Sequence, residues 1–558
     1  MKFVRRNRPV RKKLRWPAFV AVLAAGLLAT ANVPADGAAS HQLIQGTGSS
    51  WATNAINVWV AGVTSSGLQV VFTSTGSAQG RKDFGNQTTD FAVSDIGYLG
   101  KDPLTGQLDV PCKLNSQQDC RPYAYLPIVS GGTSFPYHLT VAGKLVRNLR
   151  LSGQTLAKIF TGGIKNWNDK AISDDNNGRK FPSIPIIPIT HQEGSGSTAQ
   201  FTLYLDQQYP NIWRPYAGGA GSTEYYPHKV GIAQNGSDSI INYITSAAAN
   251  GSIGYDEYSY ALAKNYPVAK IENAAGNFTL PTQYNVAVAL QKAQINMNKA
   301  SPDYLLQNLS QVYVDRDPRT YPLSSYSYMI IPTSAADSRM TTAKRQTLAD
   351  FLYYSVCQGQ ALVGAVGYSS LPLNLVQASF DQTAKLKTAD PKVDLARRNV
   401  TTCNNPTFVP GNLSANHLAQ IAPAIPACDR AGAGPCADAG NPGTSSAAAT
   451  STAGGANSGQ SGSTSTGTGD LALGTKKPST GPTKAAAVKV DPATGEQVTD
   501  TSGVSDSEVT GVPTDLAAYR QCDMSPVLAP LAAIEMLAVL IVPPLFYFYV
   551  LRRRRGRP

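Results

Sequence analysis

The stretch QGTGSSWATNAINVWV, residues 45–60, joins a loop of glycine and hydroxyl residues to a helical pattern. Trp51, Ala55 and Trp59 are four residues apart, which predicts an amphipathic helix over 51–60. A second helical pattern covers Thr342–Gly359. Short apolar runs that are typical of strands occur at Gln69–Thr73, Ile186–Thr190 and Tyr326–Ile331. Because strands alternate with helices, the sequence predicts an α/β sheet with helices on both sides.

The GTGSS loop at 46–50 has two counterparts, STGS at 74–77 and GSGS at 194–197, and each precedes a predicted helix. Helix N-termini present unpaired N–H groups, and serine adds hydroxyl donors. One such loop is typical of an ordinary helix cap, but three in one domain predict an anion-binding cage. The chain has no GxxxxGK[ST] motif for a nucleoside triphosphate. The third loop also lacks the G-x-S-x-G spacing of a nucleophile elbow.

The net charge of +12 is concentrated at the two ends of the 558-residue chain. Eight basic residues lie between Lys2 and Arg15 and five between Arg552 and Arg557, which leaves 35 basic and 36 acidic residues elsewhere. A nucleic-acid-binding protein carries its positive charge on the folded domain, so we expect no nucleic-acid partner. We interpret both basic clusters as membrane-topology signals.

The N-terminal cluster precedes a short apolar run and small residues, which predicts a signal peptide over 1–39, with an uncleaved anchor helix as the alternative. At the other end, the apolar segment 526–551 is long enough to cross a bilayer, and the basic tail 552–558 would hold that end in the cytoplasm. The alternative is a buried globular helix. The preferred interpretation is a single-pass protein of the cell membrane, with its folded domain outside the cytoplasm.

Residues 437–520 are dominated by Ala, Gly, Ser, Thr and Pro, which predicts a disordered stalk. The folded unit is expected to run from about His41 to Leu375, or as far as Cys436. Of the seven cysteines, Cys112 and Cys120 bracket a short polar loop and could form a disulfide, whereas the other pairings stay open. The five scattered histidines show no metal-ligand spacing, so no metal or cofactor is expected.

Several longer motifs carry a resemblance to a known family. They are GTGSSW at 46–51, FTSTGS at 72–77, DFAVSD at 90–95, IFTGGIKNWND at 159–169, GSIGY at 251–255 and GYSSLP at 367–372. Together, over about 45–376, they resemble the phosphate-binding subunit of the phosphate ABC importer, in the periplasmic-binding-protein superfamily. The resemblance implies a type II fold with two lobes joined by crossing strands. Lobe one would comprise 41–135 and 286–425, and lobe two 136–285.

The resemblance also implies a set of phosphate-binding residues. Asp95 matches the family's carboxylate, which accepts a hydrogen bond from a protonated phosphate oxygen and repels sulfate, which has no proton to share. The remaining matched positions are Ser50, the Trp51 amide, Ser77, Ser195, Gly196 and Ser197.

One position departs from the family pattern. Four residues before the loop serine, the family usually has an arginine that pairs with phosphate, and this chain has His191. A neutral histidine supplies one donor and no charge, and it could equally serve as a hydrogen-bonding loop residue. Arg81 and Lys82, one turn after Ser77, offer a compensating charge, although we expect both to be exposed.

The sequence therefore predicts a receptor for inorganic phosphate that works with ABC permease subunits. One alternative is a membrane-anchored adhesion, scaffold or sensor protein that keeps the fold with altered or lost anion binding. A phosphatase-like enzyme is disfavoured, because no nucleophile–base pair or metal cluster is evident.

Overall fold

The computed structural model describes residues 41–113, 120–396 and 399–437. All of the described residues belong to one compact unit. The predicted signal peptide, the segment 526–551 and the basic tail lie outside the described residues, as does the stalk except for Ala437. Among the helices in the described part of the chain, none is both long and apolar enough to cross a membrane.

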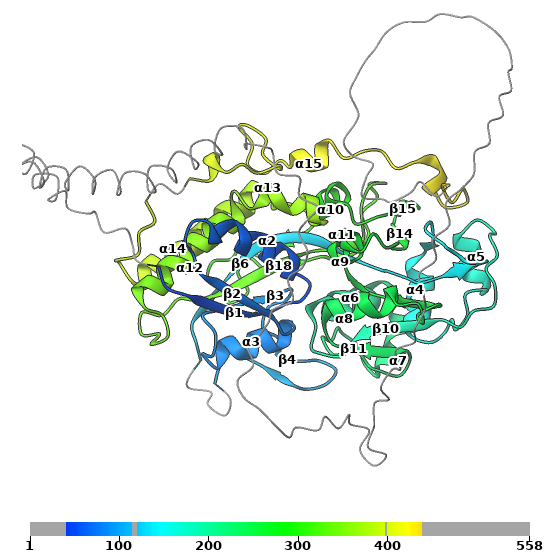
Figure 1. The fold of residues 1–558 in the computed structure, drawn as a ribbon, viewed down its shortest axis with the longest axis horizontal. Helices are drawn as coiled ribbons and strands as arrows, with labels where there is room; N and C mark the ends of the chain where they lie inside the picture. The colour runs from blue at the N-terminus through cyan, green and yellow to red at the C-terminus, as the bar shows by residue number, and fades with distance from the viewer. Residues whose placement is uncertain (1–40, 114–119, 397–398, 438–558) are drawn as a thin grey trace, which may run out of the picture. The chain divides into compact units, whose positions relative to one another are not determined.

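The largest sheet has six strands and carries the first two predicted loops at one edge (Figure 1). β1 runs parallel to β2 and β3, whereas β18 is antiparallel to β3 and β6. In spatial order its strands are β13 (Asp256–Glu257), β6 (Tyr123–Ser134), β18 (Ser324–Pro332), β3 (Phe91–Ser94), β1 (Ile44–Gly48) and β2 (Val70–Ser74).

Helices lie on both faces of this sheet, as the sequence predicts. α3 packs against β1 and β3, whereas α12 contacts α2 and α14, and α14 packs against β6. β18 is buried along its whole length and β6 is buried after its first residue, because they lie in the middle of the sheet. The helices associated with this sheet are α2 (Thr53–Thr64), α3 (Ser77–Gly85), α10 (Gln283–Leu290), α12 (Thr342–Val356), α13 (Gln360–Val363) and α14 (Leu373–Ala389).

A second, three-stranded sheet carries the third loop. β10 (Ile187–His191) lies between β11 (Ile232–Gln234) and β12 (Ser252–Gly254) and is parallel to both. The sheets are connected through β6: it ends at Ser134, and Tyr137 already bridges Ile253 of β12. The neighbouring helices are α4 (Gly153–Phe160), α5 (Lys170–Asp175), α6 (Gly196–Gln208), α7 (Pro210–Ala217), α8 (Gly236–Thr245) and α9 (Tyr258–Ala263).

Smaller elements complete the described fold. A third sheet has the order β15 (Phe278–Thr279), β14 (Lys270–Glu272), β9 (Arg150–Leu151). The short strand pairs are β4 (Gly100–Lys101) with β5 (Leu108–Asp109), β7 (Thr140–Val141) with β8 (Lys144–Leu145), and β16 (Gln294–Ile295) with β17 (Gln307–Asn308). The short helices are α11 (Ser310–Tyr313) and α15 (His417–Gln420).

The predicted elements are present with shifted ends. The helix expected over 51–60 begins at Thr53, because Ser49, Ser50 and Trp51 form the loop in front of it. The helix expected over 342–359 ends at Val356. The three predicted strands lie at β2, β10 and β18, each within two residues of its expected bounds.

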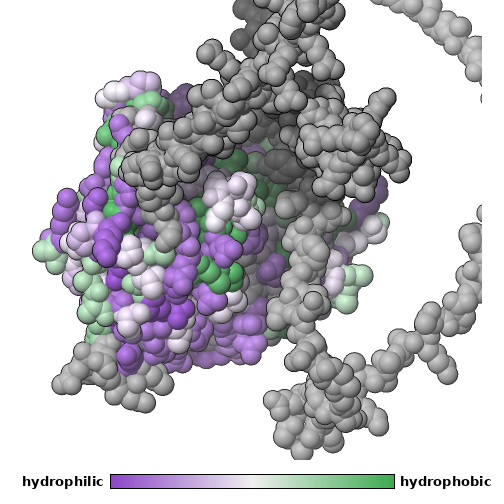
Figure 2. Space-filling view, turned by 60° about the vertical axis from the view of Figure 1, so that its left-hand side comes forward, coloured by the Kyte–Doolittle hydropathy of each residue, from purple (hydrophilic) through white to green (hydrophobic). Residues whose placement is uncertain are grey.

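Three disulfides close loops in the described chain: Cys112–Cys120, Cys357–Cys403 and Cys428–Cys436. The first confirms the expected pairing, and the other two were open in the sequence. The fold extends to Cys436, the longer of the two expected limits, because Cys436 forms a disulfide with Cys428 and its carbonyl accepts a hydrogen bond from Asn148 Nδ2. On the face shown in Figure 2, hydrophilic side chains surround smaller groups of hydrophobic ones.

Candidate functional site

The three predicted loops converge on the Asp95 carboxylate, which follows β3 and is buried. Ser49 of the first loop donates its hydroxyl to both carboxylate oxygens at 2.8 Å. Ser77 of the second loop donates to Oδ2 at 3.2 Å, and Ser327 of β18 donates to Oδ1 at 2.8 Å. Three hydroxyl donors therefore surround one acid.

The third loop meets this cluster through glycine. A Cβ added to Gly196 would lie 2.4 Å from Asp95 Oδ2 and 2.7 Å from Ser77 Oγ, so only a residue without a side chain fits. Gly196 is the first residue of α6, a 13-residue helix. The N-terminus of α6, with its partial positive charge, thus points toward the Asp95 cluster.

The first loop is held in place by residues from several elements. Gly48 has φ +142° and approaches the Val93 carbonyl so closely that a Cβ would clash with it. Ser50 accepts a hydrogen bond from the Ser237 hydroxyl at 2.9 Å. Trp51 is buried, and its carbonyl accepts from the Tyr368 hydroxyl at 2.6 Å. The structure thus places Ser50 and Trp51 at the start of α2, with their side chains inside the domain.

The serines of the third loop differ in their surroundings. Ser195 is the N-cap of α6 and accepts a hydrogen bond from the Thr198 amide at 3.4 Å. The Ser197 hydroxyl is buried and has no hydrogen-bond partner among the described residues. An unpaired buried donor is unfavourable, so Ser197 is suited to bind a ligand.

His191, at the end of β10, is fully buried. Its Nδ1 lies 2.7 Å from Glu193 Oε1, and Glu193 Oε2 accepts from the Gly236 amide at 2.9 Å. Burial disfavours the imidazolium, but the charges of Glu193, Asp256 and Asp95 outweigh it and raise the pKa of His191 above its usual value. His191 Nε2 is buried without a partner in the described part of the chain. When the imidazole is protonated, His191 Nε2 therefore offers a charged N–H donor that no described residue uses.

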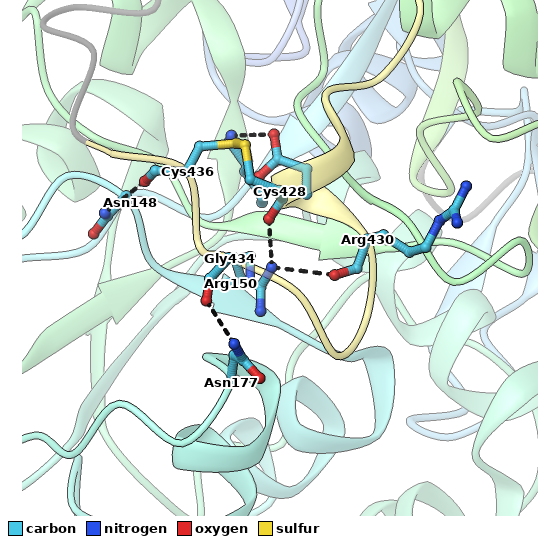
Figure 3. The surroundings of a disulfide bond; sticks show 9 residues. Asn148, Arg150, Asn177, Cys428, Arg430, Gly434 and Cys436 are labelled. Carbon is cyan, nitrogen blue, oxygen red and sulfur yellow. Dashed lines mark hydrogen bonds and ion pairs between the residues drawn. A yellow bond between two sulfur atoms is a disulfide. The ribbon is translucent and has the colours of Figure 1, made fainter.

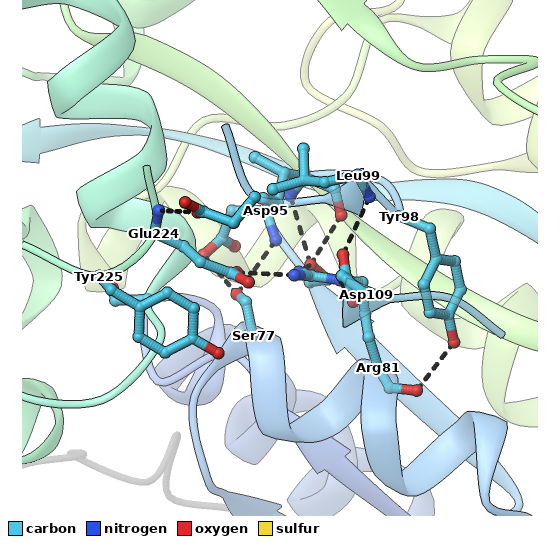
Figure 4. A network of polar contacts seen from close by, with 12 residues as sticks. Ser77, Arg81, Asp95, Tyr98, Leu99, Asp109, Glu224 and Tyr225 are labelled. Atoms are coloured by element: carbon cyan, nitrogen blue, oxygen red, sulfur yellow. Dashed lines mark hydrogen bonds and ion pairs between the residues drawn. The ribbon is translucent and has the colours of Figure 1, made fainter. Parts of the chain in front are cut away.

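Arg81 is not exposed, contrary to the sequence-based expectation (Figure 4). Its Nε donates to Asp109 at 2.9 Å, its Nη1 to Ser94 at 2.7 Å and its Nη2 to Glu224 at 2.6 Å. The two carboxylates overcome the effect of burial and raise the pKa of Arg81. Because its guanidinium is paired with the carboxylates of Asp109 and Glu224, Arg81 does not take the place of the family's phosphate-binding arginine. Lys82 is partly exposed, and its Nζ lies 3.4 Å from the Tyr225 hydroxyl.

Two buried acids of the site, Asp95 and Asp256, have raised pKa values. Burial raises the pKa of Asp95, although its hydroxyl donors and Arg81 oppose the shift. Burial also raises the pKa of Asp256 to about 7, and one Asp256 oxygen has no hydrogen-bond partner within the described residues. A protonated Asp256 would be a further donor near His191.

Sequence reasoning missed Ser49, Ser237, Asp256 and Ser327. Ser49 stands inside the first loop motif and Asp256 directly follows the GSIGY motif, so a closer inspection of both segments could have found them. Ser327 lies 232 residues beyond Asp95, and no local pattern relates the two. Among the described residues, no group of three His, Cys, Asp or Glu side chains is arranged to hold a metal.

Comparisons with known proteins agree on one family. The model of the PBP superfamily domain matches residues 32–358. The chain is 31% identical over 334 residues to phosphate-binding protein PstS 2 of Mycobacterium tuberculosis, and the match covers 59% of this chain and 83% of that protein. It is 30% identical over 381 residues to phosphate-binding protein PstS3 of Mycobacterium bovis, and the match covers 64% of this chain and 95% of that protein.

A solved structure of a high-affinity periplasmic phosphate-binding protein (PfluDING) with bound phosphate is 20% identical and covers 65% of this chain and 98% of that one, with a TM-score of 0.46. The fold and the family model define a two-lobed α/β domain of the PBP superfamily. Within that superfamily, the chain belongs to the family of PstS phosphate-binding proteins.

Proposed function

We propose that this protein binds inorganic phosphate outside the cytoplasm, as the solute-binding receptor of an ABC phosphate import system. The observation that carries the proposal is the Asp95 carboxylate, buried beside the N-terminus of α6 and surrounded by three serine hydroxyls. Such an acid excludes an anion that has no proton, yet accepts a hydrogen bond from protonated phosphate. The family relationship supports the same ligand.

The proposed ligand set keeps the positions expected from the sequence. Their hydroxyls, backbone amides and imidazole supply donors, and Asp95 supplies the acceptor. The buried, unpartnered atoms His191 Nε2 and Ser197 Oγ support two of these assignments. The full set is Ser50, Trp51, Ser77, Asp95, His191, Ser195, Gly196 and Ser197.

The lobes proposed for this domain are 41–135 with 286–425, and 136–285. Contacts across this division support a clamp that closes on its ligand: the Ala78 amide donates to the Gly194 carbonyl at 3.0 Å, and Gln200 Nε2 donates to the Asp95 carbonyl at 3.0 Å. Domain closure by hinge motion is the usual response of such proteins to ligand. We propose further that the protein binds phosphate without turning it over, is anchored by residues 526–551 and delivers phosphate to permease subunits.

Calorimetric titration of the full chain with phosphate, and separately with sulfate, tests the proposal. We expect saturable binding of phosphate and none of sulfate. A chain that unfolds cooperatively yet binds neither anion would contradict the proposal and favour a scaffold that has kept the fold without its ligand.

A further inference from the structure

A segment beyond the family's matched region connects the two lobes. The family model ends at residue 358 and α14 ends at Ala389, but the described chain continues to Ala437. Residues 403–436, here called the strap, run over α10 and reach β14 and β15 (Figure 1, yellow). In the proposed division, α14 belongs to lobe one, and β14 and β15 belong to lobe two.

The first part of the strap is fixed to lobe one. Cys403 forms a disulfide with Cys357, directly after α12. Asn405 Nδ2 and Thr407 Oγ1 both donate to the Leu371 carbonyl at 2.9 Å. This end is therefore held by a covalent bond and by buried hydrogen bonds.

The middle of the strap is fixed at α10. Leu418, Ala419 and Ala422 form a small buried cluster with Ala287 and Val288 of that helix. In addition, Arg319 Nη1 donates to the carbonyls of Ala419 and Ala422, at 3.2 and 3.3 Å. Apolar contact and a charged donor together position α15.

The far end of the strap is fixed to lobe two (Figure 3). Lys270 Nζ and Asp429 Oδ2 are 2.6 Å apart, and Asp429 is buried. Arg150 Nη1 donates to the carbonyls of Cys428 and Arg430, at 3.0 and 3.4 Å. The Cys428–Cys436 disulfide closes the loop that presents these carbonyls. Two further contacts are Asn148 Nδ2 to the Cys436 carbonyl at 2.9 Å and Asn177 Nδ2 to the Gly434 carbonyl at 3.0 Å.

Only the five residues 423–427, with the sequence PAIPA, lie between the α10 contact at Ala422 and the lobe-two contacts that begin at Cys428. Proline fixes its own φ and restricts the residue before it, so such a segment behaves as a short, semi-rigid spacer. At about 3.1 Å per residue it spans roughly 15 Å. Because both ends are fixed, moving them further apart than this length would break contacts at one end.

We propose that the strap restrains the hinge: it couples the two lobes and keeps them near the closed arrangement even without ligand. Opening the cleft requires lobe two to rotate away from lobe one, which strains the link or separates Lys270 and Arg150 from the end of the strap. A larger population of the binding-competent state raises the apparent affinity for ligand in proportion. The restraint rests on the two-lobe division and does not depend on which ligand the cleft accepts.

The test lengthens the link without removing any contact. Gly-Ser-Gly-Ser is inserted between Ala424 and Ile425 of the full chain, and the matched control carries the same insertion after Gly143, at the exposed β7–β8 turn. Hydrogen–deuterium exchange is measured without phosphate on peptides that contain the Ala78 amide, which bonds across the lobes to Gly194. We expect exchange at least about threefold faster than in the control, because opening becomes easier.

Equal exchange at Ala78 in both insertions would overturn the proposal. Peptides of β18 report the intact fold and should exchange alike in both variants. If β18 also exchanges faster in the strap variant, the same exchange is measured on the double variant Cys428→Ser, Cys436→Ser, which loosens only the far end of the strap. Faster exchange at Ala78 with unchanged exchange at β18 would support the restraint, and unchanged exchange at Ala78 would overturn it. The exchange measurement needs no phosphate, so a protein that fails to bind phosphate would still confirm or refute the restraint.

Discussion

At the scale of single residues, Asp95 is predicted to select the ligand. Asp95→Asn should weaken the exclusion of sulfate more than it weakens phosphate binding, because an amide can donate to either anion whereas a carboxylate only accepts. Competition titrations measure the ratio of the two affinities.

A matched control is available at the other end of β3. Asp90 is equally buried, but it pairs with Arg339 and Lys344 at 2.8 Å. Asp90→Asn should therefore lower thermal stability and leave the selectivity unchanged. Sulfate exclusion that survives Asp95→Asn would remove Asp95 from the site.

His191 is predicted to make phosphate binding depend on pH. The carboxylates of Glu193, Asp256 and Asp95 favour the protonated imidazole and raise its pKa. The centroid of the Tyr255 ring lies 5.3 Å from the centroid of the imidazole. Since its pKa is raised, the imidazolium is present below the usual value of about 6.5 and is lost as the pH rises through the higher folded-state value. Its contribution to stability follows the same direction. Phosphate affinity should fall over this range when measured by calorimetry at several pH values.

The second ionisation of phosphate overlaps this window, as it does for phosphate esters near 6, so the wild type alone does not decide. His191→Arg keeps a charge at every pH, and it should flatten the pH profile and tighten binding at alkaline pH. Parallel profiles for the two proteins would make His191 a structural loop residue.

At the scale of elements, the ion pair between α3 and the loop that contains Glu224 is predicted to stabilise the closed cleft. In the proposed division Arg81 and Glu224 belong to different lobes, whereas Arg81 and Asp109 belong to the same lobe. Glu224→Gln should lower phosphate affinity about tenfold or more, since truncating one partner of a buried charged pair is strongly unfavourable.

Asp109→Asn is the comparison for that variant. It breaks an ion pair within one lobe, so it should mainly lower the melting temperature. If Glu224→Gln binds phosphate as tightly as the wild type, the ion pair has no part in closure.

The elements also show what the sequence could and could not predict. The helices that follow the three loops and the strands β2, β10 and β18 were predicted correctly, because each depends on residues that are adjacent in the chain. The strand β1 was not predicted, and it includes the first three residues of the expected loop at 46–50. Arg81 was expected to be exposed and is buried, because its partners Glu224 and Asp109 lie 143 and 28 residues away in the sequence. Ser327, a partner of Asp95, was missed for the same reason, whereas Ser77 was expected from its own loop motif. Local patterns position a loop, whereas the charge balance of a site depends on distant partners.

At the scale of the whole molecule, the fold continues past the point where aromatic residues become scarce. The segment after Phe408 has no Phe, Trp or Tyr before Tyr519, which indicates little capacity for a core. The strap is nevertheless ordered, because disulfides and hydrogen bonds to the two lobes hold it where apolar burial is small. Composition alone underestimates such a segment, since its partners belong to other parts of the chain.

A fragment that ends at Ala437 should therefore be a complete binding domain. All of the described contacts of the site and the strap lie within 41–437, so residues 40–437, produced with their disulfides, should unfold in one cooperative transition. Phosphate affinity should match that of the full chain within about twofold, which is about 0.4 kcal/mol. Calorimetric unfolding and titration of the fragment measure both quantities. Aggregation, a broad transition or a large loss of affinity would mean that residues beyond 437 contribute to the domain and that its boundary lies further along the chain.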